Sequence, residues 1–79
     1  MAEKLLIVED EETLSESLKR VFAREGYDAE AAKSAEVALQ RMEEATYDLV
    51  ITDIILPGID GIELARKVKE KFPDQIMIG

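Results

Sequence analysis

The 79-residue sequence contains no cysteine and no histidine. The absence of cysteine excludes disulfides, a thiolate nucleophile and cysteine-ligated zinc, and the absence of histidine removes the commonest general base and metal ligand. A metal ion bound by this sequence would therefore be a hard cation held by oxygen atoms, such as Mg²⁺.

Long apolar runs are absent as well, and cationic residues are few. No apolar stretch approaches the roughly 20 residues of a membrane span. The first residues lack the apolar core and cleavage site of a signal peptide, so we expect a cytoplasmic protein without membrane contact. Ten Lys and Arg against 18 Asp and Glu give a formal net charge of −8. This balance argues against a nucleic-acid surface, because counterion release requires clustered cations.

Short apolar runs alternate with amphipathic stretches along the whole chain. Strands are predicted at 5–8, 27–32, 49–52 and 75–79, with the second half-exposed at a sheet edge, and helices at 13–24, 35–44 and 60–72. The third run is apolar and rich in β-branched residues, which is typical of a strand buried on both faces. Short connections and right-handed crossovers make this a parallel sheet with helices on both faces, in one small domain.

The helix ends and the inward faces of the helices can also be predicted. Gly26 is placed to adopt a left-handed conformation after the first helix, Ser34 to cap the second, and Pro73 to stop the third. The residues that we expect to face the core, helix by helix, are Leu14, Leu18, Val21 and Phe22; Val37, Ala38, Leu39 and Met42; and Ile62, Leu64, Ala65, Val68 and Phe72.

Acidic residues follow two of the predicted buried strands. Glu9 and Asp10 come directly after the first strand, and Asp53 directly after the third. The alternation of strands and helices predicts a flavodoxin-like or a Rossmann-like half. If the first and third strands are neighbours, as in the flavodoxin-like order 2-1-3-4-5, the three carboxylates converge where ligands bind. Close carboxylates repel one another unless a cation neutralises them, and a hard divalent ion would do so. Two simpler interpretations are that Glu9 and Asp10 only stabilise a helix N-terminus and that Asp53 only bonds loop amides.

The same residues resemble a known family. The segment Val8-Glu9-Asp10-Glu11, the block 53–61 with its Asp, Leu, Pro, Asp and Gly, and the helix end 24–27 are similar to the receiver domain of bacterial response regulators. The resemblance covers essentially the whole chain. The combination of an acidic pair after the first strand with D-x-x-L-P-x-x-D-G after the third is specific, whereas each motif alone is weak.

This resemblance implies a function in two-component signalling. Asp53 matches the aspartate that accepts a phosphoryl group from a sensor histidine kinase. Glu9 and Asp10 match the pair that holds Mg²⁺, Asp10 directly and Glu9 often through water, and the backbone carbonyl of Ile55 matches a further ligand. The domain would be a phosphoacceptor rather than an enzyme, and the kinase would dock around the first helix.

The sequence also departs from the family pattern. A hydroxyl residue after the fourth strand and a Lys after the fifth contact the phosphoryl group in the family, and neither position falls within residues 1–79. The expectation is a flavodoxin-like sheet of order 2-1-3-4, an incomplete receiver domain that stops before the fourth helix and the fifth strand. Self-dephosphorylation is not expected without the Lys. An alternative is a truncated or engineered half-domain that self-associates through its unpaired fourth strand and does not switch.

Overall fold

The computed structural model describes residues 2–52 and 61–78. The elements in chain order are β1 (Lys4–Val8), α1 (Glu12–Arg24), β2 (Asp28–Ala32), α2 (Ala35–Glu44), β3 (Leu49–Thr52), α3 (Gly61–Lys71) and β4 (Met77–Ile78). The predicted alternation of strands and helices is confirmed. The predictions for Asp53, Ile55 and the residues up to Asp60 concern a part of the chain outside the described residues.

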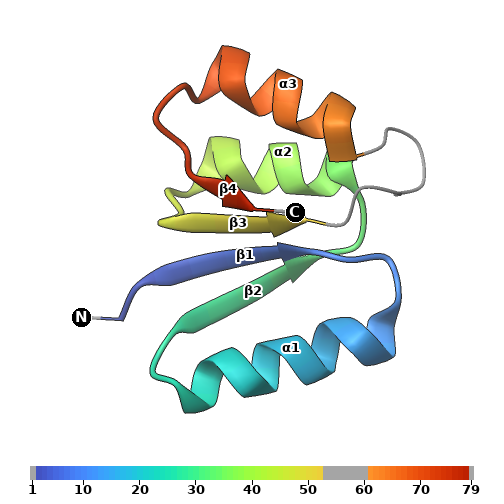
Figure 1. Cartoon of the computed structure of the whole chain (residues 1–79), viewed down its shortest axis with the longest axis vertical. Coiled ribbons are helices and arrows are strands. Elements are labelled where there is room, and N and C mark those ends of the chain that lie inside the picture. Colours follow the sequence, from blue (N-terminus) through green and yellow to red (C-terminus); the bar gives the residue numbers. More distant parts are fainter. Residues whose placement is uncertain (1, 53–60, 79) are drawn as a thin grey trace.

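The described strands form one parallel sheet in the order β2-β1-β3-β4 (Figure 1). This order and the edge position of β2 are as the sequence predicted. Leu5 of β1 pairs with Ala29 on one side and Leu49 on the other, and Val8 pairs with Ala32 and Thr52. The carboxyl ends of β1, β2 and β3 therefore lie in line at one edge of the sheet.

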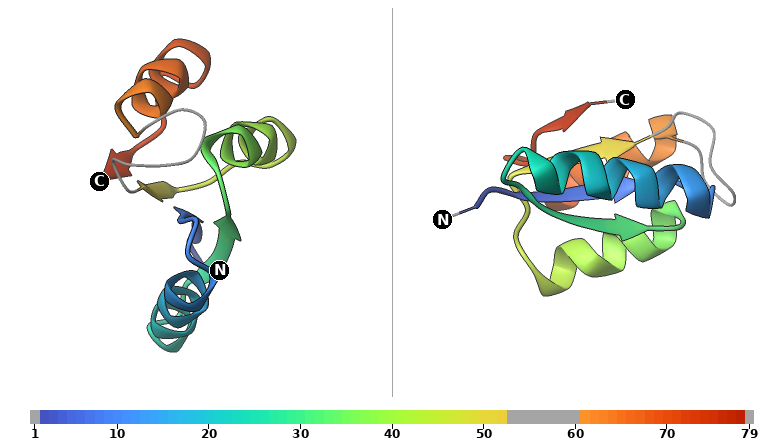
Figure 2. Two further views of the ribbon diagram at one scale, coloured as in Figure 1. Left: turned by 90° about the vertical axis from the view of Figure 1, so that its right-hand side faces the viewer. Right: turned by 90° about the horizontal axis from the view of Figure 1, so that it is seen from below.

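Helices lie on both faces of this sheet (Figure 2). The main core cluster combines side chains of β1 and β3 with those of α2 and α3, among them Leu6, Val50, Met42, Leu64 and Val68. Because strand side chains alternate between faces, the buried residues Leu5 and Ile7 point to the opposite face, which α1 covers.

Local sequence signals mark the start of α2 and the end of α1 as predicted. Ser34 has extended backbone angles, and its Oγ accepts a hydrogen bond of 3.2 Å from the backbone N–H of Val37, which caps α2. Gly26 has a φ of 93°, a conformation that glycine adopts without strain, and it lets the chain turn from α1 into β2.

The predicted inward face of α1 is only partly correct. Leu18 and Phe22 are half-buried, but Leu14 is 43% exposed and Val21 is 52% exposed, while Ser15 is buried in their place. The reason is that α1 packs against β2 and β1, which cover the side of the helix that carries Ser15 more fully than the side that carries Leu14 and Val21.

The predicted inward face of α3 is also only partly correct. Leu64 and Val68 are buried and Phe72 is half-buried, as expected, whereas Ile62 and Ala65 are exposed. The contacts of α3 are with α2 and the core cluster, which take up one narrow side of the helix.

A polar network ties β2, β1 and α2 together on the face opposite α1. The Glu30 carboxylate accepts a hydrogen bond of 2.7 Å from the Tyr47 hydroxyl and lies 3.5 Å from Lys4 Nζ and 3.7 Å from Arg41 NH1. The Tyr47 hydrogen bond is the main reason why the pKa of Glu30 lies below its ordinary value. Burial, together with Glu30, raises the pKa of Tyr47 to about 12.

Replacing Tyr47 by Phe removes the hydroxyl and leaves the ring. We expect a loss of about 1–2 kcal/mol of stability near neutral pH, because a hydrogen bond to a charged and partly buried carboxylate is lost. A lowered pKa stabilises the fold above the ordinary pKa of Glu30 and ceases to do so as the pH falls through the lowered value. The gap in urea-unfolding free energy between wild type and Tyr47→Phe should therefore narrow in acid, and a gap independent of pH would contradict this role.

Candidate functional site

The candidate site is built at the carboxyl edge of the sheet, where β1 and β3 end side by side. Val8 pairs with Thr52, so the residues that follow β1 begin next to the end of β3. The Glu9 N–H donates a hydrogen bond of 3.0 Å to the carbonyl of Ala32, which holds the chain against β2 for one residue beyond β1. The backbone of Val8 is thus held by both β2 and β3, and that of Glu9 by β2.

The Glu9 side chain is buried and directed toward the start of α1. Its Oε2 accepts a hydrogen bond of 3.1 Å from the backbone N–H of Glu11, just before the helix begins at Glu12. This bond is the helix-stabilising interaction that the simpler interpretation expects of such an acid. It uses one carboxylate oxygen and leaves the other able to bind a cation or a water.

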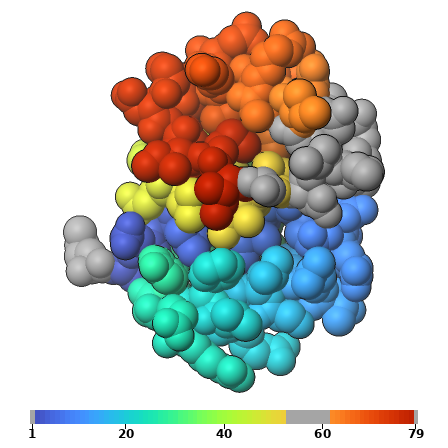
Figure 3. All heavy atoms as spheres, viewed as in Figure 1, coloured from blue at the N-terminus to red at the C-terminus, as the bar shows by residue number. Residues whose placement is uncertain are grey.

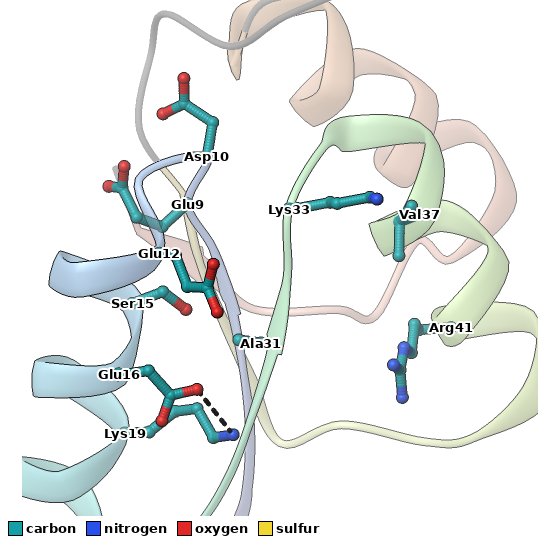
Figure 4. A pocket seen from close by; sticks show the side chains of 10 residues that line it. All are labelled: Glu9, Asp10, Glu12, Ser15, Glu16, Lys19, Ala31, Lys33, Val37 and Arg41. Carbon is teal, nitrogen blue, oxygen red and sulfur yellow. Dashed lines mark ion pairs between the residues drawn. The ribbon is translucent and has the colours of Figure 1, made fainter.

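Asp10 is exposed at the same end of β1, and its carboxylate stands beside that of Glu9 in Figure 4. Two carboxylates at one strand end supply the hard oxygen donors that suit Mg²⁺. The described residues contain no group of three acidic side chains close enough to hold a metal ion. The proposed third carboxylate, Asp53, follows the buried Thr52 in the sequence and lies outside the described residues, as does Ile55.

A cavity of about 440 Å³ opens beside these acids. Glu9 and Asp10 line its mouth, and from there it runs between α1 and α2 past Ala31 of β2 (Figure 4). This cavity is not predictable from the sequence patterns. Its lining comes from α1, β2, α2 and the turn that holds Lys33, and no single stretch of sequence carries a signal for that combination.

A parallel sheet of order 2-1-3-4 flanked by helices, with an acidic pair after the central strand, defines a flavodoxin-like receiver architecture. The family model for the response regulator receiver domain matches residues 5–78. The chain belongs to this family, whose members act in two-component signalling.

Known proteins with similar sequences and structures support the same assignment. The chain is 38% identical over 75 residues to the transcriptional regulatory protein ResD of Bacillus subtilis (strain 168). The alignment covers 95% of this chain and 31% of ResD. The response regulator TrrA of Thermotoga maritima, solved in complex with Mg²⁺-BeF, has a TM-score of 0.91 at 39% identity, covering 95% of this chain and 65% of that one. A complex of the histidine kinase ThkA with TrrA gives a TM-score of 0.90 at 39% identity, with the same coverage.

The chain therefore spans about a third of the length of ResD and about two thirds of the length of the matched TrrA chains. In the part of the chain that the structure describes, no helix has the length and apolar character needed to cross a membrane.

Proposed function

We propose that this domain accepts a phosphoryl group on Asp53 from a sensor histidine kinase. The observation that carries the proposal is the pairing of Val8 with Thr52, because it aligns the strand that precedes Glu9 and Asp10 with the strand that precedes Asp53. TrrA, at 39% identity, supports the proposal through its solved complexes with Mg²⁺-BeF and with a histidine kinase.

The proposed reaction is a transfer between two groups. A carboxylate oxygen of Asp53 forms the new bond to phosphorus, while the bond from phosphorus to the donor, a histidine nitrogen of the kinase, breaks and leaves its electron pair on that nitrogen. Glu9, Asp10, Asp53 and the Ile55 carbonyl would hold Mg²⁺, which would offset the negative charge that the carboxylates and the phosphoryl oxygens bring together. The domain is the acceptor in this transfer, and the kinase is the enzyme.

Within the chain, each acid has a separate task. The hydrogen bond from the Glu11 N–H holds the Glu9 carboxylate in one orientation, and the exposure of Asp10 keeps its carboxylate open to solvent and to a bound ion. A rigid sheet edge keeps both acids in place without a large reorganisation when the donor arrives.

Incubation with Mg²⁺ and acetyl phosphate followed by intact mass measurement tests the proposal. We expect an adduct of one phosphoryl group on the wild type and none on Asp53→Asn, since an amide is not a nucleophile here. Asp48→Asn is a matched control that removes a carboxylate from the opposite end of β3, and its adduct should persist. An adduct that survives Asp53→Asn would place the acceptor elsewhere.

A second proposal is that the 79-residue chain self-associates, and an exposed apolar surface supports it. Exposed Leu14 and Val21 of α1 lie on the same face of the sheet as Ile76 and Ile78, since Ile78 pairs with Ile51 and strand residues alternate. Atoms of β1 and β3 remain visible between α1 and β4 in Figure 3. We call these four side chains the open apolar face.

The occupant that we propose for the open apolar face is a second copy of the chain. The face continues to the outer edge of β4, where the described sheet ends, and a two-fold arrangement would bring identical apolar faces and strand edges together. Such self-association would serve assembly rather than signalling, and it would be compatible with phosphorylation of Asp53.

Light scattering at micromolar concentration tests self-association. We expect a mass above that of the monomer for the wild type and a monomer for Ile78→Lys, because a charge at the centre of an apolar interface is costly to bury. Ile62→Lys is the matched control, since Ile62 is also exposed, at 69% against 54% for Ile78, but lies on α3, on the other side of the sheet. A monomeric wild type with a sharp melting transition would contradict the proposal.

A further inference from the structure

The cavity beside Glu9 and Asp10 continues as a slot along the outer edge of β2. One wall is α1, with Glu12, Ser15, Glu16 and Lys19. The other wall consists of Lys33 in the turn before α2 and of Val37 and Arg41 on α2. Figure 4 shows Ala31 of β2 between the two walls. The slot is therefore bounded on two sides, by α1 and by α2 with the turn before it.

The backbone of β2 at the base of the slot has unused hydrogen-bonding groups. Asp28 donates to the carbonyl of Glu3, and the carbonyl of Ala32 accepts from Glu9, so the alternate residues Asp28, Glu30 and Ala32 bond to β1. The N–H and C=O groups of Ala29 and Ala31 consequently point away from the sheet. β2 is the last strand on this side of the described sheet, and no described strand pairs with those groups.

The side chains of Ala29 and Ala31 leave space for another chain. Both side chains are methyl groups on the α1 face of the sheet, since these residues pair with Leu5 and Ile7. Ala31 lines the 440 Å³ cavity and fills little of it. This volume lies in the range of sites that bind small ligands or short peptide segments. A bulky residue at either position would have occupied the space over the strand edge.

The two walls carry opposite uncompensated charges. Glu16 pairs with Lys19 at 3.7 Å and Arg41 with Glu30 at 3.7 Å, whereas Glu12 and Lys33 make no ion pair with any described residue. Glu12 belongs to the α1 wall and Lys33 to the turn before α2. A strand added beside β2 would direct alternate side chains toward these two walls.

We propose that the slot binds an extended peptide segment of a partner protein as an added strand on β2. The peptide's backbone pairs with Ala29 and Ala31, a basic side chain faces Glu12, and the acidic side chains on either side of it face Lys33 and Arg41. This is recognition by strand addition, in which main-chain hydrogen bonds give affinity and alternate side chains give specificity.

A second copy of β2 does not meet these requirements. Two β2 strands paired side by side would bring Asp28 and Glu30 close to the same residues of the other copy, and like charges on neighbouring strands are destabilising. The alternating charges that the slot requires identify a different segment, and the site is separate from the open apolar face.

Synthetic peptides and amide NMR test the proposal on the whole chain. The probe is acetyl-Thr-Glu-Lys-Glu-Thr-amide, and its control is the charge-swapped acetyl-Thr-Lys-Glu-Lys-Thr-amide. We expect the probe to bind about threefold to tenfold more tightly than the control, the range that two or three exposed ion pairs supply. Because the protein carries a net charge of −8, non-specific attraction would favour the control peptide, so the expected order is opposite to that of net charge.

Hydrogen exchange of individual amides reports where the peptide lies. Saturation with the probe should slow exchange at Ala29 and Ala31, whose N–H groups gain partners, and leave Glu30 and Ala32 unchanged, because they already bond to β1. Exchange that stays the same at Ala29 and Ala31, or peptide affinities that follow net charge alone, would overturn the proposal.

Charge reversal at the slot provides the matched variants. Lys33→Glu should reverse the preference so that the charge-swapped peptide binds better, while Lys69→Glu, the same change at an exposed position of α3, should leave the preference as in the wild type. Both positions are exposed, so both variants should keep the fold. An equal effect of the two substitutions would show that overall charge, and not the slot, decides binding. None of these readouts depends on phosphorylation.

Discussion

Asp10→Asn is expected to lower the affinity for Mg²⁺ by at least about tenfold. Loss of a residue that only supports a metal ligand commonly lowers metal affinity by about that factor, and Asp10 is proposed as a direct ligand. The exposed carboxylate of Asp10 is the more accessible of the two to a metal ion, since one oxygen of Glu9 already accepts a hydrogen bond from the Glu11 N–H. The same variant should no longer accept a phosphoryl group from acetyl phosphate. Isothermal titration with Mg²⁺ and intact mass measurement give the two readouts.

Two further variants make this expectation specific. Glu9→Gln should have a smaller effect on Mg²⁺ affinity, because Glu9 is expected to act through water. Glu11→Gln removes the same charge from the next exposed position and should leave both readouts near the wild-type values. Retention of wild-type Mg²⁺ affinity by Asp10→Asn would show that the acidic pair serves only the N-terminus of α1.

Leu6→Ala is expected to destabilise the domain by about 2–5 kcal/mol, the range for a leucine removed from a packed core. Leu6 is fully buried at the centre of the sheet and packs against the side that carries α2 and α3. A single domain has only about 5–15 kcal/mol of stability in total, and a chain of this size has a small core. The variant should therefore be largely unfolded at moderate urea concentrations, as measured by far-ultraviolet circular dichroism.

The matched control for this experiment is Leu14→Ala. The same atoms are removed, but Leu14 is 43% exposed in the single chain, so at protein concentrations too low for self-association we expect a change well below that of Leu6→Ala. Equal losses for the two variants would mean that Leu14 is covered in solution, which is the result that self-association through the open apolar face would produce. Repeating the measurement at a lower protein concentration separates the two cases.

Much of the fold could be predicted because its signals are local. A continuous apolar run indicates a doubly buried strand, as at Val50, and Ser34 and Gly26 determine the geometry of their own turns. Once the strands and helices alternate, handedness and short connections leave few strand orders, and the resemblance to receiver domains selected the observed one.

The errors concern features that depend on distant neighbours. Leu14 and Val21 have helical spacing with the buried side of α1, but their burial depends on how far α1 extends across the sheet, which helical periodicity does not determine. The same holds for Ile62 on α3. The network around Glu30 joins residues from β1, β2, α2 and the turn before β3, so no local pattern could reveal it.

The candidate site falls between these cases. The placement of Glu9 and Asp10 at the carboxyl edge follows from the strand pattern, whereas the hydrogen bond from Glu11 to Glu9 required the structure. The roles of these acids, of Asp53 and of the Ile55 carbonyl in binding Mg²⁺ and in phosphoryl transfer stay predictions until the experiments above are done.

The central position of β1 also has a consequence for how the chain folds. β1 is the first described strand along the chain, yet its partners β2 and β3 each follow only after a complete helix, so no two strands of the described sheet can pair as a local hairpin. Folding then requires contacts between distant segments, which makes it slower than that of a helical bundle of equal length. The amides of β1, bonded on both sides, should be the last to exchange with solvent, and they would mark the segment whose opening requires the whole domain to unfold.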